Sequence, residues 1–241
     1  METPLDTTRQ DSKTVRIATS LFIFFCVPTS IWGQSYLMGK IFVAQNPVAT
    51  ATNLLANEFS FRGSILFHLL GTITFVAMML LFYQVFKPVD KFLSRLMMVS
   101  ILATIPVVLV FEVFNFTALM ILKNEARPTF DVAQQQEVAY LFLRMNRSAT
   151  GAGIGKLFYG LCFIPFGILI YRSALAPRII GILVIIGGIG YVADTSIAIL
   201  LQRPVYVMIR SYLMYTTVAY ILALLWFLIM GVRKTTTIAN H

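Results

Sequence analysis

The chain has 241 residues, of which 58% are hydrophobic and only 12% are charged, and its mean hydropathy is +0.81. A soluble domain carries about 25% charged residues, so this composition excludes an ordinary soluble protein. The net charge of +9 does not indicate nucleic-acid binding, because most basic residues flank apolar runs, where they anchor helix ends and set orientation.

The apolar runs predict an all-α fold, a polytopic transmembrane helical bundle. A helix needs about 20 predominantly apolar residues to cross the hydrocarbon core of a bilayer. Six runs reach this length or come close to it: residues 15–40, 62–86, 95–122, 154–171, 178–201 and 211–232. We therefore expect six spans that form one domain over residues 15–232, preceded by a tail over residues 1–14 and followed by a tail over residues 233–241. The first thirteen residues are polar, and we expect them to be disordered.

Two connectors between the predicted spans are long enough to hold helices of their own. Residues 41–60 contain apolar side chains compatible with a short interfacial helix. In the connector 123–153, Asp131 and Gln134 have the spacing of a capping box. Val138, Leu141, Phe142 and Met145 then recur at helical spacing. This pattern predicts an extracytoplasmic amphipathic helix over residues 132–147 that lies on the membrane surface.

Six spans place both termini on the same side of the membrane. The basic residues divide almost equally between the two sides, but those on the side of the termini lie in compact turns and tails. Many of those on the other side lie in the longest connector, where charge is a weaker signal. We therefore expect both termini to be cytoplasmic.

Proline and glycine residues interrupt several predicted spans. Pro28, Pro106 and Pro165 each lie inside a span, where a proline frees a backbone carbonyl and kinks the helix. Gly187, Gly188 and Gly190 are expected to serve close packing between helices.

Four segments of the chain resemble the DUF4386 family of bacterial membrane proteins. They are residues 57–63 (Asn-Glu-Phe-Ser-Phe-Arg-Gly), 86–89 (Phe-Lys-Pro-Val), 157–161 (Leu-Phe-Tyr-Gly-Leu) and 167–181, which include an Arg-Ser turn followed by Pro-Arg-Ile-Ile-Gly. The likeness extends over nearly the whole chain from the first predicted span to the sixth. It implies a multi-pass protein of the bacterial inner membrane. It supplies no activity and no catalytic residues.

Ionisable side chains inside membrane spans are rare and are candidates for function. The clearest are His68, Glu112 and Asp194, which lie in the second, third and fifth predicted spans. At about 1.5 Å rise per residue, all three fall in the outer half of the membrane, and Asn115 falls in the same band. This common depth predicts a polar cavity that opens to the extracytoplasmic side.

The site that we predict from these residues contains Glu112, His68, Asp194, Asn115, Arg62 and Arg144, with Arg144 on the amphipathic helix. Three interpretations remain open. The carboxylates can pair with arginines, namely Arg62, Arg144, Arg203 or Arg210, only to fix helix register, since a buried carboxylate needs a partner. They can instead line a ligand or ion cavity, or form a catalytic dyad.

Several cofactor sites are disfavoured by residue counts. A zinc site needs three or four Cys, His or acidic ligands, and the only histidines are His68 and His241. The same count disfavours bis-histidine haem. Cys26 and Cys162 lie in apolar runs, which indicates buried free thiols. We therefore expect no metal, no cofactor and no nucleic-acid partner.

These observations favour a non-enzymatic protein of the inner membrane that binds or senses a small amphiphile or lipid in the outer-half cavity. The expected partners are membrane lipids and a small amphiphilic ligand. A small proton-coupled transporter that titrates Glu112 and Asp194 is the alternative. An intramembrane enzyme that modifies lipid is a third possibility, with no catalytic residue identified.

Overall fold

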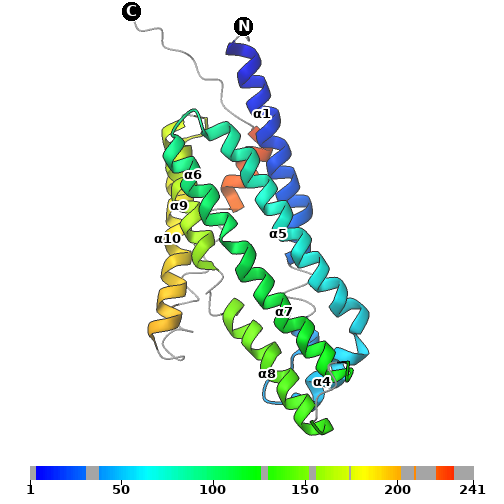
Figure 1. Cartoon of the computed structure of the whole chain (residues 1–241). Coiled ribbons are helices and arrows are strands. Elements are labelled where there is room, and N and C mark those ends of the chain that lie inside the picture. Colours follow the sequence, from blue (N-terminus) through cyan, green and yellow to red (C-terminus); the bar gives the residue numbers. More distant parts are fainter. Residues whose placement is uncertain are drawn as a thin grey trace, which may run out of the picture. The chain divides into compact units, whose positions relative to one another are not determined.

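The computed structural model describes residues 4–30, 38–125, 130–151, 156–173, 175–201, 209 and 221–230, and the regular structure in these ranges is helical, without strands (Figure 1). The helices are α1 (Pro4–Leu21), the π-helix η1 (Phe22–Cys26), α2 (Val27–Ser30), α3 (Met38–Ile41), α4 (Pro47–Ala56), α5 (Glu58–Phe86), α6 (Lys91–Leu102), α7 (Thr104–Leu122), α8 (Val132–Gly151), α9 (Lys156–Ser173), α10 (Arg178–Leu200) and a last helix, Ile221–Met230.

Four helical segments are long and apolar enough to cross a membrane. They are Glu58–Phe86, Lys91–Leu122, Lys156–Ser173 and Arg178–Leu200, which correspond to the second to fifth predicted spans. The first and sixth predicted spans include residues 31–37 and 211–220, which lie outside the described residues. The regular structure of the described residues is thus all helical, and four of their helical segments have membrane-spanning character.

Two predicted boundaries are corrected. The N-terminal stretch that we expected to be disordered is helical from Pro4 onward. The third predicted span is divided into α6 and α7 by a turn at Ala103. The break lies where Pro106 acts, because a proline cannot donate to the carbonyl four residues before it and its ring clashes with that group, here the carbonyl of Leu102.

The other two prolines of the predicted spans have different consequences. The π-helix η1 immediately precedes α2, the short helix that contains Pro28. The α-helical hydrogen-bonding pattern is therefore interrupted in the turn before Pro28, which is the turn that a proline distorts. In contrast, α9 continues through Pro165.

The chain divides into two compact units. Unit 1 comprises residues 1–23, 75–104 and 156–241, and unit 2 comprises residues 24–74 and 105–155. The helix α5 therefore contributes its first part to unit 2 and its last part to unit 1.

Unit 1 contains a hairpin of two tightly packed helices, α9 and α10 (Figure 1). Two glycine pairs allow this approach. A Cβ atom on Gly160 would lie 2.7 Å from the backbone oxygen of Gly188, and one on Gly167 would lie 2.7 Å from that of Gly181. Real Cβ atoms do not approach a carbonyl oxygen this closely, so both positions need glycine for packing. The packing role predicted for Gly188 is confirmed.

Unit 2 has its own apolar core, which draws on five helices. Its fully or nearly fully buried side chains are Ile41, Leu54, Phe61, Ala118, Leu119, Ile121, Ala139 and Leu143. The short helix predicted in the connector 41–60 is α4, which begins after Asn46; the Asn46 side-chain oxygen accepts from the amide of Ala49. The helix α4 packs against α8.

The helix predicted over residues 132–147 is present as α8, and its capping box forms as expected. Asp131 Oδ1 accepts from the amide of Gln134, and Gln134 Oε1 accepts from the amide of Asp131. Of the predicted apolar stripe, Val138 and Phe142 pack against the core of unit 2, whereas Leu141 and Met145 are exposed. The apolar side chains of α8 therefore face in two directions, and its position at the membrane surface stays a prediction.

Candidate functional site

Unit 2 holds a pair of ionisable side chains, the half-buried His68 from α5 and the buried Glu112 from α7. His68 Nδ1 lies 2.5 Å from Glu112 Oε1, and Glu112 is only 7% exposed. The imidazole nitrogen and the carboxyl oxygen share one hydrogen bond. The contact between Glu58 on α5 and Lys123 after α7 fits the same antiparallel register. The structure thus brings His68 and Glu112, two of the residues of the predicted site, together.

The second oxygen of this carboxylate binds Asn115, one turn further along α7. Asn115 Nδ2 donates to Glu112 Oε2 over 3.0 Å. Because the amide nitrogen faces the carboxyl group, the amide oxygen of Asn115 points elsewhere. Asn115 is 4% exposed, and its Oδ1 has no hydrogen-bond partner in the described structure. Leaving such a buried acceptor unmet costs about 1–3 kcal/mol.

A third helix contributes a polar side chain next to this pair. Asn146 on α8 is buried and donates from Nδ2 to the carbonyl of Phe111, the residue before Glu112. We had not placed Asn146 in the site. Its sequence signal is a polar residue three positions after Leu143, on the side of α8 that is otherwise apolar and buried. Asn146 thereby holds α8 against the backbone that carries Glu112.

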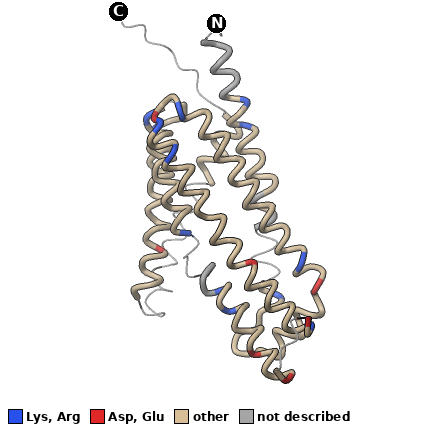
Figure 2. The backbone as a smooth tube through the Cα atoms, viewed as in Figure 1, with Lys and Arg blue, Asp and Glu red and all other residues tan. Residues whose placement is uncertain are grey.

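An ion-pair network lies at the start of α5 and beyond the end of α7 (Figure 2). Arg62 Nε donates to Glu58 over 2.8 Å, and its Nη2 lies 3.9 Å from Glu125. Lys123 donates to Glu58 and also contacts Glu125, and these hydrogen bonds raise the pKa of Lys123. Two cations and two anions thus balance one another.

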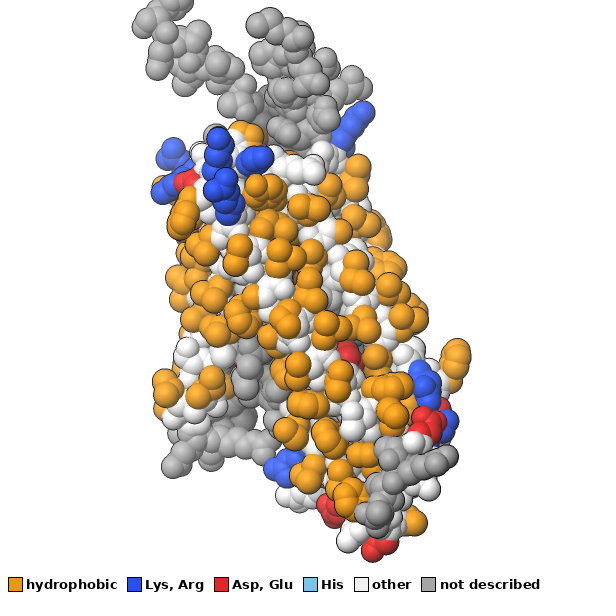
Figure 3. Space-filling view, viewed as in Figure 1, with side chains coloured by type: hydrophobic (Ala, Val, Ile, Leu, Met, Phe, Trp, Pro, Cys, Tyr) orange, Lys and Arg blue, Asp and Glu red, His pale blue; other side chains and the backbone are white. Residues whose placement is uncertain are grey.

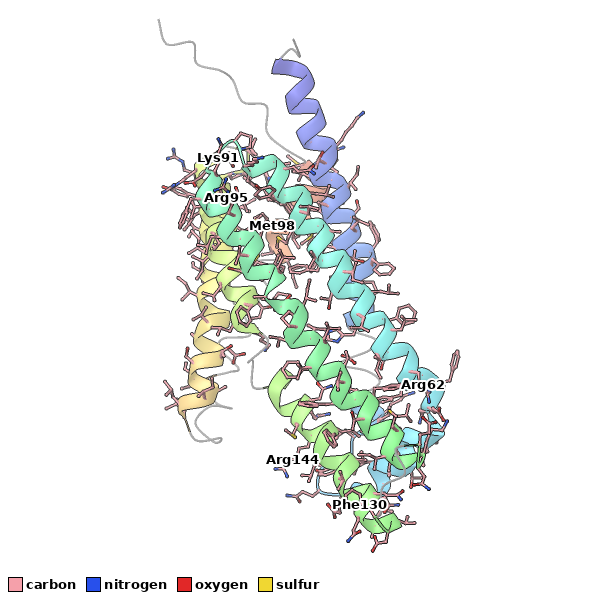
Figure 4. All side chains as sticks on the ribbon, viewed as in Figure 1. Arg62, Lys91, Arg95, Met98, Phe130 and Arg144 are labelled. Carbon is pink, nitrogen blue, oxygen red and sulfur yellow. The ribbon has the colours of Figure 1, made fainter. Side chains whose placement is uncertain are left out.

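The two arginines of the predicted site lie apart from the buried pair's own hydrogen bonds (Figure 4). Arg62 belongs to the ion-pair network, and its guanidinium carbon lies 5.7 Å from the ring centroid of Phe116. Arg144 is exposed on α8. The side-chain partners of Glu112 are His68 and Asn115, so neither Arg62 nor Arg144 takes up the pairing with Glu112 that the sequence left open. The reason is local: residues already on α5 and α7 satisfy both carboxylate oxygens.

Asp194 lies in unit 1, where its buried carboxylate accepts from Lys156 Nζ over 3.1 Å. We had expected an arginine partner; Arg203 and Arg210 lie outside the described residues. The sequence contained a signal for Lys156. Lys156 is the first residue of α9, and it lies about as many residues before the turn between α9 and α10 as Asp194 lies after it. In an antiparallel helical hairpin, two such positions come close together.

The described residues contain no group of three or more His, Cys, Asp or Glu side chains that could hold a metal ion. The site in unit 2 contains one imidazole, one carboxyl group and one amide with an unmet acceptor.

Comparisons with known proteins give one result. The family model described as "Domain of unknown function (DUF4386)" matches residues 17–231. No curated protein and no solved structure matches the chain.

Proposed function

The chain thus belongs to the DUF4386 family, and from that premise we propose that it is an integral membrane protein that binds a small amphiphile or lipid at the polar site of unit 2. The proposal includes six spans in a bacterial inner membrane, both termini in the cytoplasm and α8 on the extracytoplasmic side. The residues that we assign to the ligand are His68, Glu112 and Asn115.

One observation carries this proposal, the unmet Oδ1 of Asn115. Buried polar atoms are usually paired, because each unmet one lowers stability. The described residues have two other unmet atoms of this kind, Ser94 Oγ and Trp226 Nε1, both in unit 1, whereas Asn115 is hydrogen-bonded to an ionisable side chain. Here the carboxylate and the imidazole satisfy each other, and the acceptor beside them is left without a donor. A bound molecule that supplies this donor would recover the lost hydrogen bond.

The chemistry of the site restricts the ligand. The unmet atom is an acceptor, and the neighbouring carboxylate repels anions, so the polar end of the ligand must donate a hydrogen bond and carry no negative charge. A hydroxyl group or a primary ammonium group meets both conditions. The helices that carry these residues are strongly apolar, which suits a ligand whose remainder is a hydrocarbon chain.

Native mass spectrometry of the protein in mild detergent tests the proposal. We expect a discrete added mass on the wild-type protein that is lost in Glu112→Gln and in Asn115→Leu. Asp194→Asn is the matched control, because it also neutralises a buried carboxylate, but in unit 1. Retention of the added mass in all variants, or its absence from every form while Glu112→Gln is merely less stable, would support structural pairing instead.

A second candidate function, a proton-coupled transporter, is favoured by the position of the pair. His68 and Glu112 share a hydrogen bond inside helices of membrane-spanning character, where ionisable groups often relay protons. Proteoliposomes with an entrapped pH-sensitive dye, supplied with decylamine under an imposed pH gradient, test this idea. A carrier predicts proton flux above that of empty liposomes that Glu112→Gln abolishes, and unchanged flux in that variant would contradict it.

A further inference from the structure

Unit 1 displays a cluster of basic side chains around two neighbouring turns (Figures 2 and 3). Residues 87–95 and 171–178 contain five basic residues and one acidic residue. The basic residues are Lys87, Lys91, Arg95, Arg172 and Arg178, which we call the basic cluster. The two turns lie together because α6 packs against α9 and because Arg172 Nη1 donates to Asp90 Oδ2 over 2.8 Å.

The single acidic residue is already engaged. Asp90 caps α6, since its Oδ1 accepts from the amides of Phe92 and Leu93, while its Oδ2 accepts from Arg172. No hydrogen bond or ion pair joins the side chains of Lys91 or Arg95 to any described residue. These two cations are exposed four residues apart on α6, where like charges repel each other. An anion that bridges them would relieve this repulsion.

An apolar surface continues from these cations along the same side of α6. Phe92 is 73% exposed, Leu96 42% and Val99 65%. Their spacing of four and three residues places them on one stripe of the helix, next to the stripe that carries Lys91 and Arg95. A soluble anion has no apolar part that would contact this stripe. A phospholipid has both a phosphate for the cations and acyl chains for the stripe.

We propose that α6 is a binding site for an anionic phospholipid. Lys91 and Arg95 bind its phosphate, and its acyl chains lie along Phe92, Leu96 and Val99. Because the basic cluster has a large excess of positive charge, a headgroup with net negative charge is favoured over a zwitterionic one, whose own cation would be repelled. This site is separate from the proposed function, since it lies in unit 1 and takes an anionic ligand, whereas the ligand proposed for unit 2 carries no negative charge.

The test compares retention of phosphatidylglycerol and phosphatidylcholine by the full chain in native mass spectra. The wild-type protein is expected to retain phosphatidylglycerol in preference. Lys91→Gln with Arg95→Gln should reduce that retention roughly tenfold or more, given about 1 kcal/mol for each basic residue. The control is Lys13→Gln with Arg16→Gln, which removes the same charge from exposed positions of α1 in the same unit.

Three further measurements separate the possible outcomes. Thermal melting of each variant shows whether it is folded. Phe92→Ser with Val99→Ser should weaken retention of phosphatidylglycerol without changing charge, and inorganic phosphate should not displace the lipid. Equal losses in both charge variants, full retention in Lys91→Gln with Arg95→Gln, or displacement by inorganic phosphate would overturn the proposal.

Discussion

At the scale of single residues, the two buried carboxyl groups of the described structure have partners on a neighbouring helix or one turn along the same helix. Glu112 is held by His68 and Asn115, and Asp194 by Lys156. Ionisable residues were identifiable from the sequence because so few occur within the apolar runs. Their partners were harder to predict, because the choice among several cations depends on helix register, which hydropathy does not encode. The unmet oxygen of Asn115 depends on side-chain orientation and had no sequence signal.

The pair of Asp194 and Lys156 gives a prediction at this scale. Lys156→Met leaves a buried carboxylate without this partner and should lower the free energy of unfolding by roughly 1–3 kcal/mol. Asp194→Leu combined with Lys156→Met should cost less than the sum of the two single changes, because it removes both charges together. Equilibrium unfolding in detergent measures all three variants as a double-mutant cycle. Strictly additive effects would mean that the two side chains do not interact.

At the scale of helices, local chemistry explains where elements begin, break and pack. The capping box of Asp131 and Gln134 was predicted to the residue, because a capping motif acts over one turn. The break at Ala103 follows from Pro106, whose effect the sequence indicated as a kink without showing that it would divide the span. The glycine contacts between α9 and α10 were only partly predicted, since packing of Gly167 on Gly181 depends on how the two helices meet.

Gly167→Ala tests the tight packing of α9 on α10. The added Cβ would meet the Gly181 backbone oxygen at 2.7 Å, so the two helices must separate. Overpacking of this kind typically costs about 1–3 kcal/mol, and the thermal midpoint should fall accordingly. Gly39→Ala is the matched control, because nothing lies within 4 Å of its added Cβ. Equal midpoints for the two variants would contradict this account of the hairpin.

The capping box supports a second prediction for helices. Asp131→Ala removes the acceptor for the amide of Gln134 and should destabilise α8 by about 1 kcal/mol. Hydrogen exchange should become faster in the first turn of α8, whereas exchange in α4 should change less. Uniform acceleration across both helices would indicate that Asp131 does not act as a local cap.

At the scale of the whole molecule, the sequence identified an all-helical membrane-type chain and its family resemblance, and the family match agrees with the latter. Hydropathy identifies such helices because a long apolar helix is stable in few environments other than a membrane. The six-span topology remains our proposal, with α8 on the opposite side of the membrane from the termini.

Cysteine labelling tests this topology. In a chain with Cys26→Ala and Cys162→Ala, we introduce Lys13→Cys or Arg144→Cys, both at exposed positions. A membrane-impermeant maleimide should label the Arg144→Cys variant from outside spheroplasts and the Lys13→Cys variant only in inverted vesicles. Labelling of both variants from the same side would exclude the proposed topology.

The most direct test of the central claim, that unit 2 binds an uncharged or cationic hydrogen-bond donor at Asn115, is a comparison of two amphiphiles. Decylamine carries an ammonium group that can donate, whereas decyltrimethylammonium has the same charge and chain but no donor. Thermal melting of the wild-type protein should show greater stabilisation by decylamine, and this difference should vanish in Asn115→Leu. Equal stabilisation by both compounds, or a difference that persists in Asn115→Leu, would contradict the account.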